Sequence, residues 1–497
     1  PDRNLIRGRA ILRSTLTSVG VGIERVIAWI ERSLSHLSSV ILISYTIAVS
    51  ETEPDIHTTA DVHVSGAQAP AMEARVRESS FAALRYRDFR LLWAGQFVSI
   101  TGSQMQLVAI NWHVYLLAQP YGQRHAALAL SLVGLVRVVP IILCSLVGGV
   151  VADAFDRKRL MLIAQTAMLV AAGTLAAVTA AGLTHLWVIY LLTALASAAT
   201  AFENPARQAL LPSLVPARLL PNAVSLGFIA FQIATVSGPL LAGLILAARG
   251  PALVYASNAV SYLAVMAAVV AMRAAGRGAG EEAGKVSFEA LREGLRFVWR
   301  TPVIVQSMSL DFVATFFASA TALLPIFADQ ILHVHARGFG VLAASASVGS
   351  VVAGVVMTRA AWSRKPGAIV LASVAMYGAA TLGFGLSRIF WLSCAMLALV
   401  GAADTVSTVI RQTVRQLVTP DRLRGRMTSV NMIFFMGGPQ LGEMEAGLLA
   451  AAVGAPLSVV VGGVGTLLAV AFAASKAKAL LSYRIDRSHE DATDETA

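Results

Sequence analysis

The sequence predicts an all-α membrane protein with twelve transmembrane helices in two pseudo-symmetric six-helix halves. Of its 497 residues, 56% are hydrophobic and only 13% are charged, whereas soluble proteins carry about 25% charged residues. The charged residues alternate with long uncharged runs, and one segment recurs after a shift of 204 residues. A soluble protein of this composition would need an implausibly large dry core, so we expect the chain to lie in a lipid bilayer.

The uncharged runs define the individual helices. Residues 160–202 contain no Asp, Glu, Lys or Arg, which is enough for two spans of about 20 residues each. Two further runs, 219–248 and 250–272, are separated only by Arg249. Taken along the whole chain, these runs predict helices at 91–117, 126–151, 160–181, 185–206, 221–248, 252–273, 302–330, 338–361, 367–386, 389–411, 427–451 and 456–476.

Lys and Arg gather in every second loop. One set of loops is rich in them, as in the run Arg157, Lys158 and Arg159. The alternate loops hold only Arg124, Arg249, Arg337 and Arg388. The positive-inside rule places the rich loops, and both termini, in the cytoplasm. The net charge of +11 therefore reflects membrane topology, and we expect no nucleic-acid partner.

An internal repeat divides the helices into two halves. Residues 207–226 align without a gap on 411–430, with six identities in twenty positions, among them Arg207 with Arg411. Parallel repeats of this kind are typical of transporters whose halves rock around a site at the middle of the membrane.

The predicted organisation has five segments: an N-terminal extension (1–83), a first half (84–273), a cytoplasmic linker (274–300), a second half (301–480) and a cytoplasmic tail (481–497). Met72 is the expected native start, and the residues before it are expected to be disordered or not native. Apolar residues recur at helical spacing from Phe288 to Val298, which predicts an amphipathic helix on the membrane surface.

Four motifs carry a family resemblance. The pattern GxxADxxxRKR, formed by Gly149, Asp153, Arg157, Lys158 and Arg159, resembles the signature loop of the major facilitator superfamily. The stretches RYRDFRLLWAGQFVSITG, FENPARQALLPSLVP and TPDRLRGRM resemble the bacterial branch that includes the enterobactin exporter and macrolide-efflux proteins. The resemblance covers about residues 84–478 and implies the fold and a transport function, but not the substrate.

The resemblance implies that the signature loop is a gate. Asp153 would meet the N-terminus of the eleventh helix, where the helix dipole favours an anion. Arg157 would pair with Glu203 at the cytoplasmic end of the fourth helix, beside Arg207. The alternative is that the cations only set topology. The second-half copy has Thr358 in place of Asp153, so the gate is predicted to be asymmetric.

Charged residues inside the predicted spans are costly and therefore suggest function. They are Arg137, Asp311, Asp404, Glu443 and Glu445. A desolvated carboxylate tends to have a raised pKa and can take up and release a proton, so we expect Asp311 and Glu443 to be proton or cation sites. The alternative is structural pairing with Arg137 or with each other. Relatives often carry an acid early in the first helix, where this chain has none.

Amide and aromatic side chains form the candidate substrate lining. They are Gln104, Asn111, Trp112, Gln232, Phe316, Asn431 and Gln440. Such a mixture suits a bulky amphipathic compound, although amides also form hydrogen bonds between packed helices. No phosphate-binding loop and no His/Cys cluster with metal spacing occurs, so we expect no metal and no cofactor beyond the proton gradient.

These observations predict a secondary exporter of small amphipathic molecules that works as a proton antiporter in drug or natural-product efflux. A dedicated siderophore exporter or a lipid-moving relative is one alternative. A non-transporting membrane sensor is another, which the charges within the spans disfavour. We expect a monomer without enzymatic activity in the bacterial inner membrane, with the lipid bilayer and the substrate as its partners.

Overall fold

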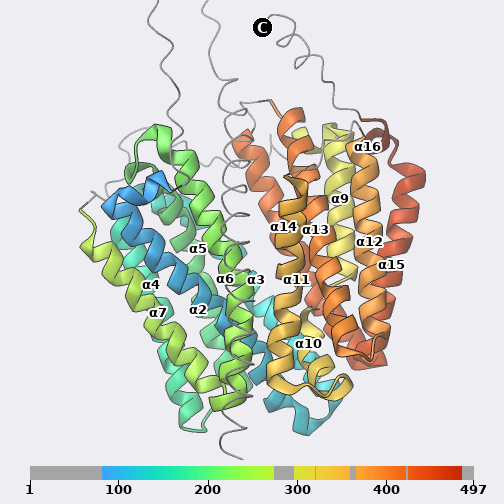
Figure 1. The fold of residues 1–497 in the computed structure, drawn as a ribbon, viewed down its shortest axis with the longest axis horizontal. Helices are drawn as coiled ribbons and strands as arrows, with labels where there is room; N and C mark the ends of the chain where they lie inside the picture. The colour runs from blue at the N-terminus through green and yellow to red at the C-terminus, as the bar shows by residue number, and fades with distance from the viewer. Residues whose placement is uncertain (1–80, 274–295, 320, 359–364, 421–423, 484–497) are drawn as a thin grey trace, which may run out of the picture. The chain divides into compact units, whose positions relative to one another are not determined.

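The computed structural model describes residues 81–273, 296–319, 321–358, 365–420 and 424–483, and every regular element in these ranges is helical (Figure 1). The long helices are α2 (Arg87–Ala118), α3 (Gln123–Ala154), α4 (Arg157–Ala180), α5 (Leu186–Leu210), α6 (Leu220–Arg249), α7 (Pro251–Ala271), α9 (Pro302–Phe317), α11 (His335–Met357), α12 (Pro366–Leu386), α13 (Phe390–Val418), α14 (Arg424–Val453) and α15 (Ala455–Lys476). The short α16 (Lys478–Ser482) follows α15. The N-terminal extension up to residue 80, most of the linker and the end of the tail lie outside the described residues.

Ten helices of the described residues are long and apolar enough to cross a membrane. The helices α2 and α14 are 32 and 30 residues long but fall outside that group. The predicted number of twelve spans therefore stays a prediction.

The predicted seventh span, 302–330, is wrong as a single helix. The helix α9 ends at Phe317 and is followed by η5 (Thr321–Leu323), α10 (Leu324–Ile326) and the π-helical η6 (Phe327–Ile331). The helix α9 ends well before Pro325, with Ala318 as its C-cap, and Pro325 lies in the first turn of the short α10.

The described residues divide into two units by packing. One consists of the chain up to Tyr86 together with Val215–Phe228, and within it the Ala83 N–H donates to Asn222 Oδ1 at 3.0 Å. The other contains Arg87–Leu214 and Ile229–Ala497. All contacts between helices described below lie inside this second unit, where α12 runs beside α13 and α15, and α4 beside α7 (Figure 1).

The 204-residue repeat extends to the helix boundaries. Both the first and the last residue of α14 lie 204 positions after those of α6, and α15 begins 204 positions after α7. The insertions that change the register therefore lie earlier in each half.

Two glycines related by the 204-residue shift allow a helix of each half to pack closely against the other half. A Cβ placed on Gly243 of α6 would lie 2.8 Å from the Cα of Gly340 in α11. A Cβ placed on Gly447 of α14 would lie 2.4 Å from the Cβ of Ser131 in α3. Small residues at such crossings allow close approach of helix backbones in membranes, so α6 and α14 each cross to the opposite half in the same way.

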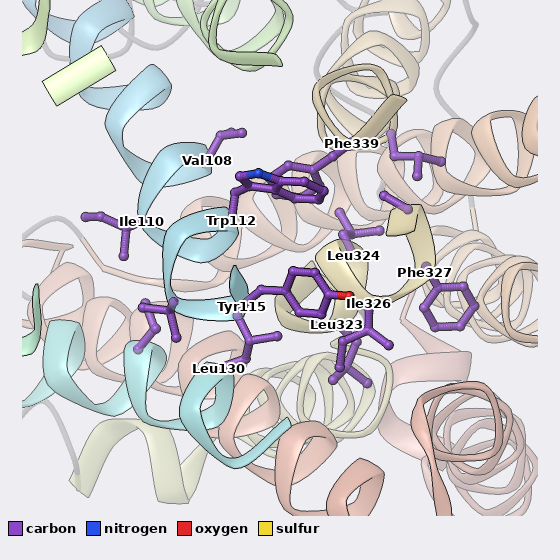
Figure 2. Packing of buried hydrophobic residues seen from close by; sticks show 14 of the residues in the cluster. Val108, Ile110, Trp112, Tyr115, Leu130, Leu323, Leu324, Ile326, Phe327 and Phe339 are labelled. Carbon is purple, nitrogen blue, oxygen red and sulfur yellow. The ribbon is translucent and has the colours of Figure 1, made fainter. Parts of the chain in front are cut away.

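One hydrophobic cluster joins both halves where α2 ends and α3 begins. Trp112 stacks on Phe339 with ring centroids 5.3 Å apart, and the buried Tyr115 points toward Leu324 and Ile326 (Figure 2). We call this region the closed end. The other described clusters each belong to one half. Apolar packing therefore joins the two halves at the closed end.

Candidate functional site

The run of cations after α3 caps the ends of neighbouring helices. Asp156 is the N-cap of α4, and its Oδ1 accepts the Arg159 N–H at 3.0 Å. Arg157 Nη1 donates to the Ala209 carbonyl at 2.8 Å, in the last turn of α5. Lys158 Nζ donates to a carbonyl directly after α7 at 2.7 Å. Carbonyls at helix C-termini lack partners within the helix and favour cations.

The predicted pair between Arg157 and Glu203, which the resemblance implies for the state closed on the cytoplasmic side, is not formed among the described residues of this structure. Glu203 Oε1 lies 3.2 Å from Arg207 Nε and accepts a hydrogen bond from Gln96 Nε2 at 3.0 Å. Glu203 pairs with Arg207 because the two residues lie one turn apart on α5, where oppositely charged side chains meet. Gly149 and Asp153 belong to α3, but their side chains lie outside the described residues, so contact between Asp153 and α14 stays a prediction.

Asp311 of α9 forms an ion pair with Arg411 of α13, not with Arg137 as the structural alternative held. The two side chains are 19% and 10% exposed. Arg411 is also held by its own helix, since Nε donates to the Ser407 carbonyl at 3.2 Å and Nη2 to Thr408 Oγ1 at 3.0 Å. The guanidinium is therefore fixed toward α9.

Asp404 and Asp311 line the same small pocket. The pocket is lined by Asp311, Ala314, Thr315, Val374, Tyr377, Ala403, Asp404 and Ser407, and we call it the acid pocket. Within the described part of the chain, Asp404 has no hydrogen bond or ion pair, and the buried Ser407 Oγ has no hydrogen-bond partner. Arg411 thus forms an ion pair with one of the two carboxylates, and its charge also acts on the other, Asp404.

A second acid lies between the halves. Glu443 of α14 accepts a hydrogen bond from Thr321 Oγ1 at 3.0 Å, and the charge of Arg137 in α3 acts on it. A Cβ on Gly134 of α3 would lie 3.1 Å from Glu443 Oε2. Glu445 is partly buried. Asp311 and Glu443 therefore belong to different sites, each with its own arginine.

The candidate substrate residues do not gather in the acid pocket. Trp112 is 6% exposed and belongs to the closed end, so its assignment as lining is wrong for this conformation. Phe316 packs against its neighbours Phe312 and Phe317. Gln440 Oε1 is buried without a hydrogen-bond partner among the described residues.

Three other amides show no partner for the side chain within the described ranges. Gln104, Asn111 and Gln232 are each partly buried, and none donates or accepts a side-chain hydrogen bond there. The alternative role, in which these amides form hydrogen bonds between packed helices, is therefore not observed for these three residues in the described ranges. Asn431 has its side chain outside the described residues.

Sequence reasoning missed a polar group at the closed end. Tyr115 donates to Asp329 Oδ2 at 2.7 Å, and Gln330 Nε2 donates to Tyr115 Oη at 3.1 Å. His335 Nδ1 lies 3.0 Å from Asp329 Oδ1. The sequence signal for this group was Asp329 at the end of a predicted span, close to His333 and His335. These bonds connect α2 of the first half to the segment before α11.

The chain is similar to known transport proteins. Its residues 78–491 match the family described as transmembrane secretion effector. Enterobactin exporters EntS from Shigella boydii serotype 18 and Escherichia coli O1:K1 are each 25% identical over 380 residues, which is 76% of this chain and 89% of theirs.

Solved transporter structures share the fold. A bacterial homologue of the human lysosomal transporter Spinster, in an inward-facing unoccupied conformation, aligns with a TM-score of 0.62 at 16% identity, covering 81% of this chain and 99% of that one. A D-xylose–proton symporter aligns with a TM-score of 0.60 at 12% identity and the same coverage. The predicted fold class is confirmed. The chain belongs to the transmembrane secretion effector family of the major facilitator superfamily and is a multi-pass membrane transporter.

Proposed function

We propose that this protein is a secondary active exporter of small amphipathic molecules that works by alternating access and exchanges its substrate for protons. The observation that carries the proposal is the hydrophobic cluster that joins the two halves at the closed end. Alternating access requires two halves that close at one end while the substrate site opens at the other.

The distribution of Lys and Arg indicates which end of the helices faces the cytoplasm. Arg157, Lys158 and Arg159 lie at the end of the helices opposite to Tyr115, and the positive-inside rule assigns that end to the cytoplasm. The closed end then faces outward, and both termini are cytoplasmic in the bacterial inner membrane. In this state a substrate enters from the cytoplasm, which is the first step of export.

Proton exchange is supported by ionisable side chains that lie inside otherwise apolar membrane-spanning helices. The acid pocket places Asp311 and Asp404 together inside the second half, beside a single ion-paired Arg411. Charges at such depth are costly and mark ion pathways or proton relays in membrane proteins. No ATP-binding loop occurs in the sequence, so an ion gradient is the proposed energy source.

The substrate class rests on the relatives and on the amides. The similar proteins are named enterobactin exporters, which favours a siderophore as a specific candidate. The amides of Gln104, Asn111 and Gln232 have hydrogen-bonding capacity that the described residues leave unused. Such groups, among apolar side chains, suit an amphipathic ligand with several polar atoms.

Purified protein in liposomes tests the proposal directly. A pH gradient is imposed, and accumulation of enterobactin, macrolides and cationic dyes is followed, with protein-free liposomes as the control. We expect at least one compound to accumulate against its gradient and to leak out when a protonophore is added. Absence of gradient-dependent flux for every compound would contradict proton antiport.

A further inference from the structure

We propose that Asp404 carries the exchanged proton in the acid pocket, and that Asp311 is its charged neighbour, held by Arg411. This assignment rests on the proposed proton antiport and specifies the group that performs it. Protonation forms an O–H bond on the Asp404 carboxylate with a proton taken from hydronium on one side of the membrane. Release breaks that bond and passes the proton to water on the other side.

The charge balance of the pocket singles out Asp404. Asp311 already has a cation, because Arg411 forms the ion pair with it. The remaining donors of Arg411 are directed to its own helix, at Thr408 and the Ser407 carbonyl. An unpaired carboxylate away from water is strongly disfavoured in its charged form. Asp404 has no ion pair of its own among the described residues, although the charge of Arg411 also acts on it, and a proton is the smallest cation that neutralises it.

Ser407 gives an independent indication of a ligand at this place. Its side chain is 3% exposed, lines the acid pocket and has an Oγ without a hydrogen-bond partner among the described residues. Ser407 follows Asp404 by three residues, so both side chains lie on one face of α13. A hydroxyl can donate to a carboxylate or accept from a carboxylic acid, and it therefore suits both protonation states.

The size of the pocket excludes an organic substrate. Its free space holds roughly one water molecule. Such a water could link Asp404 to Ser407 and pass a proton on. Small cations are the ligands that fit, and the proposal commits to the proton, with sodium as the rival that the experiment separates.

The charged and titratable neighbours of Asp404 in the described structure come from three helices. They are Asp311 of α9, Tyr377 of α12, and Arg411 and Arg415 of α13. The charges of Arg415, Asp311 and Arg411 act on one another. The phenol of Tyr377 is buried and donates to the Ala318 carbonyl at 3.4 Å, so it stays neutral.

Infrared difference spectroscopy tests the proton site without any substrate. Spectra of the purified full chain are recorded at about pH 5 and about pH 8, a range that spans the shifts seen for interior carboxyl groups. We expect the carboxylic-acid C=O band that appears on acidification to be lost in Asp404→Asn. The band should persist in Asp156→Asn, whose amide preserves the α4 cap, and it should shift in Asp404→Glu.

Two spectroscopic results would overturn the assignment. A band unchanged in both Asp404 variants would place the proton elsewhere, and the Asp404→Glu variant keeps this test valid if Asp404→Asn does not fold. A band that sodium chloride removes at constant pH, while choline chloride does not, would identify a sodium site instead of a proton site.

Transport assays separate this proposal from the proposed function. With enterobactin as the test compound, Asp404→Asn should lose accumulation driven by a pH gradient but keep exchange between equal pools, because exchange needs no net proton movement. Asp404→Asn with full gradient-driven accumulation would overturn the proposal. Wild-type protein without gradient-driven flux would contradict antiport itself, whereas the spectra would still decide whether Asp404 binds a proton.

Discussion

Arg207 and Arg411 occupy equivalent positions in the two halves, and their own helices hold them in the same way. Arg207 Nη2 donates to Asn204 Oδ1 at 2.7 Å, and Arg411 Nη2 donates to Thr408 Oγ1 at 3.0 Å. Asn204 and Thr408 are themselves related by the 204-residue shift. The repeat has therefore preserved the arginine together with the residue that orients it.

The carboxylate that faces each arginine differs. In the first half it is Glu203, on the same helix as Arg207. The equivalent position in the second half is Ser407, and the acid comes instead from α9 as Asp311. A pair within one helix keeps its geometry when helices move, whereas a pair between two helices depends on their relative position. The first half therefore has an ion pair within one helix, and the second half has an ion pair between two helices that depends on their relative position.

Removal of Arg411 should have the largest effect, because Asp311 would become an uncompensated buried charge. We expect Arg411→Gln to lower the free energy of unfolding by about 3–5 kcal/mol, the usual cost of breaking a buried pair. The matched variant Arg207→Gln should cost less, because the Arg207 side chain is 34% exposed and the buried Glu203 keeps its hydrogen bond from Gln96. Thermal unfolding in detergent measures both, and equal losses would contradict the difference between the halves.

Transplanting the first-half arrangement should recover stability without recovering function. Asp311→Asn leaves Arg411 without a carboxylate, and adding Ser407→Glu supplies one at the position equivalent to Glu203, one turn before the arginine. We expect the double variant to regain most of the unfolding free energy that the single variant loses, but no proton-coupled transport. A double variant no more stable than Asp311→Asn would show that the two positions are not equivalent in space.

The glycines at the closed end extend the comparison to the contact between halves. A Cβ on Gly243 or on Gly447 would lie within 3.0 Å of atoms in the opposite half, so each Gly→Ala variant should cost about 1–3 kcal/mol through overpacking. The control is Gly354→Ala, since nothing lies within 4 Å of a Cβ there. Melting temperatures in detergent provide the measurement. If only one of the two variants is destabilised, the halves do not contribute equally to the closed end.

The hydroxyl of Tyr115 should have a smaller effect on the same contact. Tyr115→Phe removes the bond to Asp329 and the bond from Gln330, at an expected cost of about 1–2 kcal/mol. Tyr121→Phe is the control, because Tyr121 is 73% exposed. Labels at the closed end should report a population with separated halves in Tyr115→Phe. An unchanged population would mean that the hydrophobic cluster alone keeps this end closed.

The smallest effect on stability is expected at the predicted gate. Asp153→Asn should change the unfolding free energy by about 0–1 kcal/mol, while transport falls at unchanged expression. Thr358, which stands at this place in the second-half copy, offers the matched variant Thr358→Val, for which we expect normal transport. Normal transport in Asp153→Asn would reduce the loop to a topology signal and to the helix caps formed by Arg157 and Lys158.

The sequence predicted most of the helices because a bilayer imposes a simple rule. Backbone polar groups within it must be satisfied internally, so a long uncharged run has to become a helix. The predicted range 456–476 therefore differs by one residue from α15, which begins at Ala455 and ends at Lys476. The same rule misled for 302–330, because the apolar composition continues past Phe317 although α9 ends there.

The membrane class, the two halves and the acids inside the spans were thus determined by the sequence alone, because each follows from composition or from a fixed spacing along the chain. Only the tertiary structure decided the partners of those acids. Arg411 lies among loop-proximal cations in the sequence, yet it faces Asp311 of another helix. Pairing between helices depends on the rotation and depth of each helix in the bundle, and a run of apolar residues encodes neither.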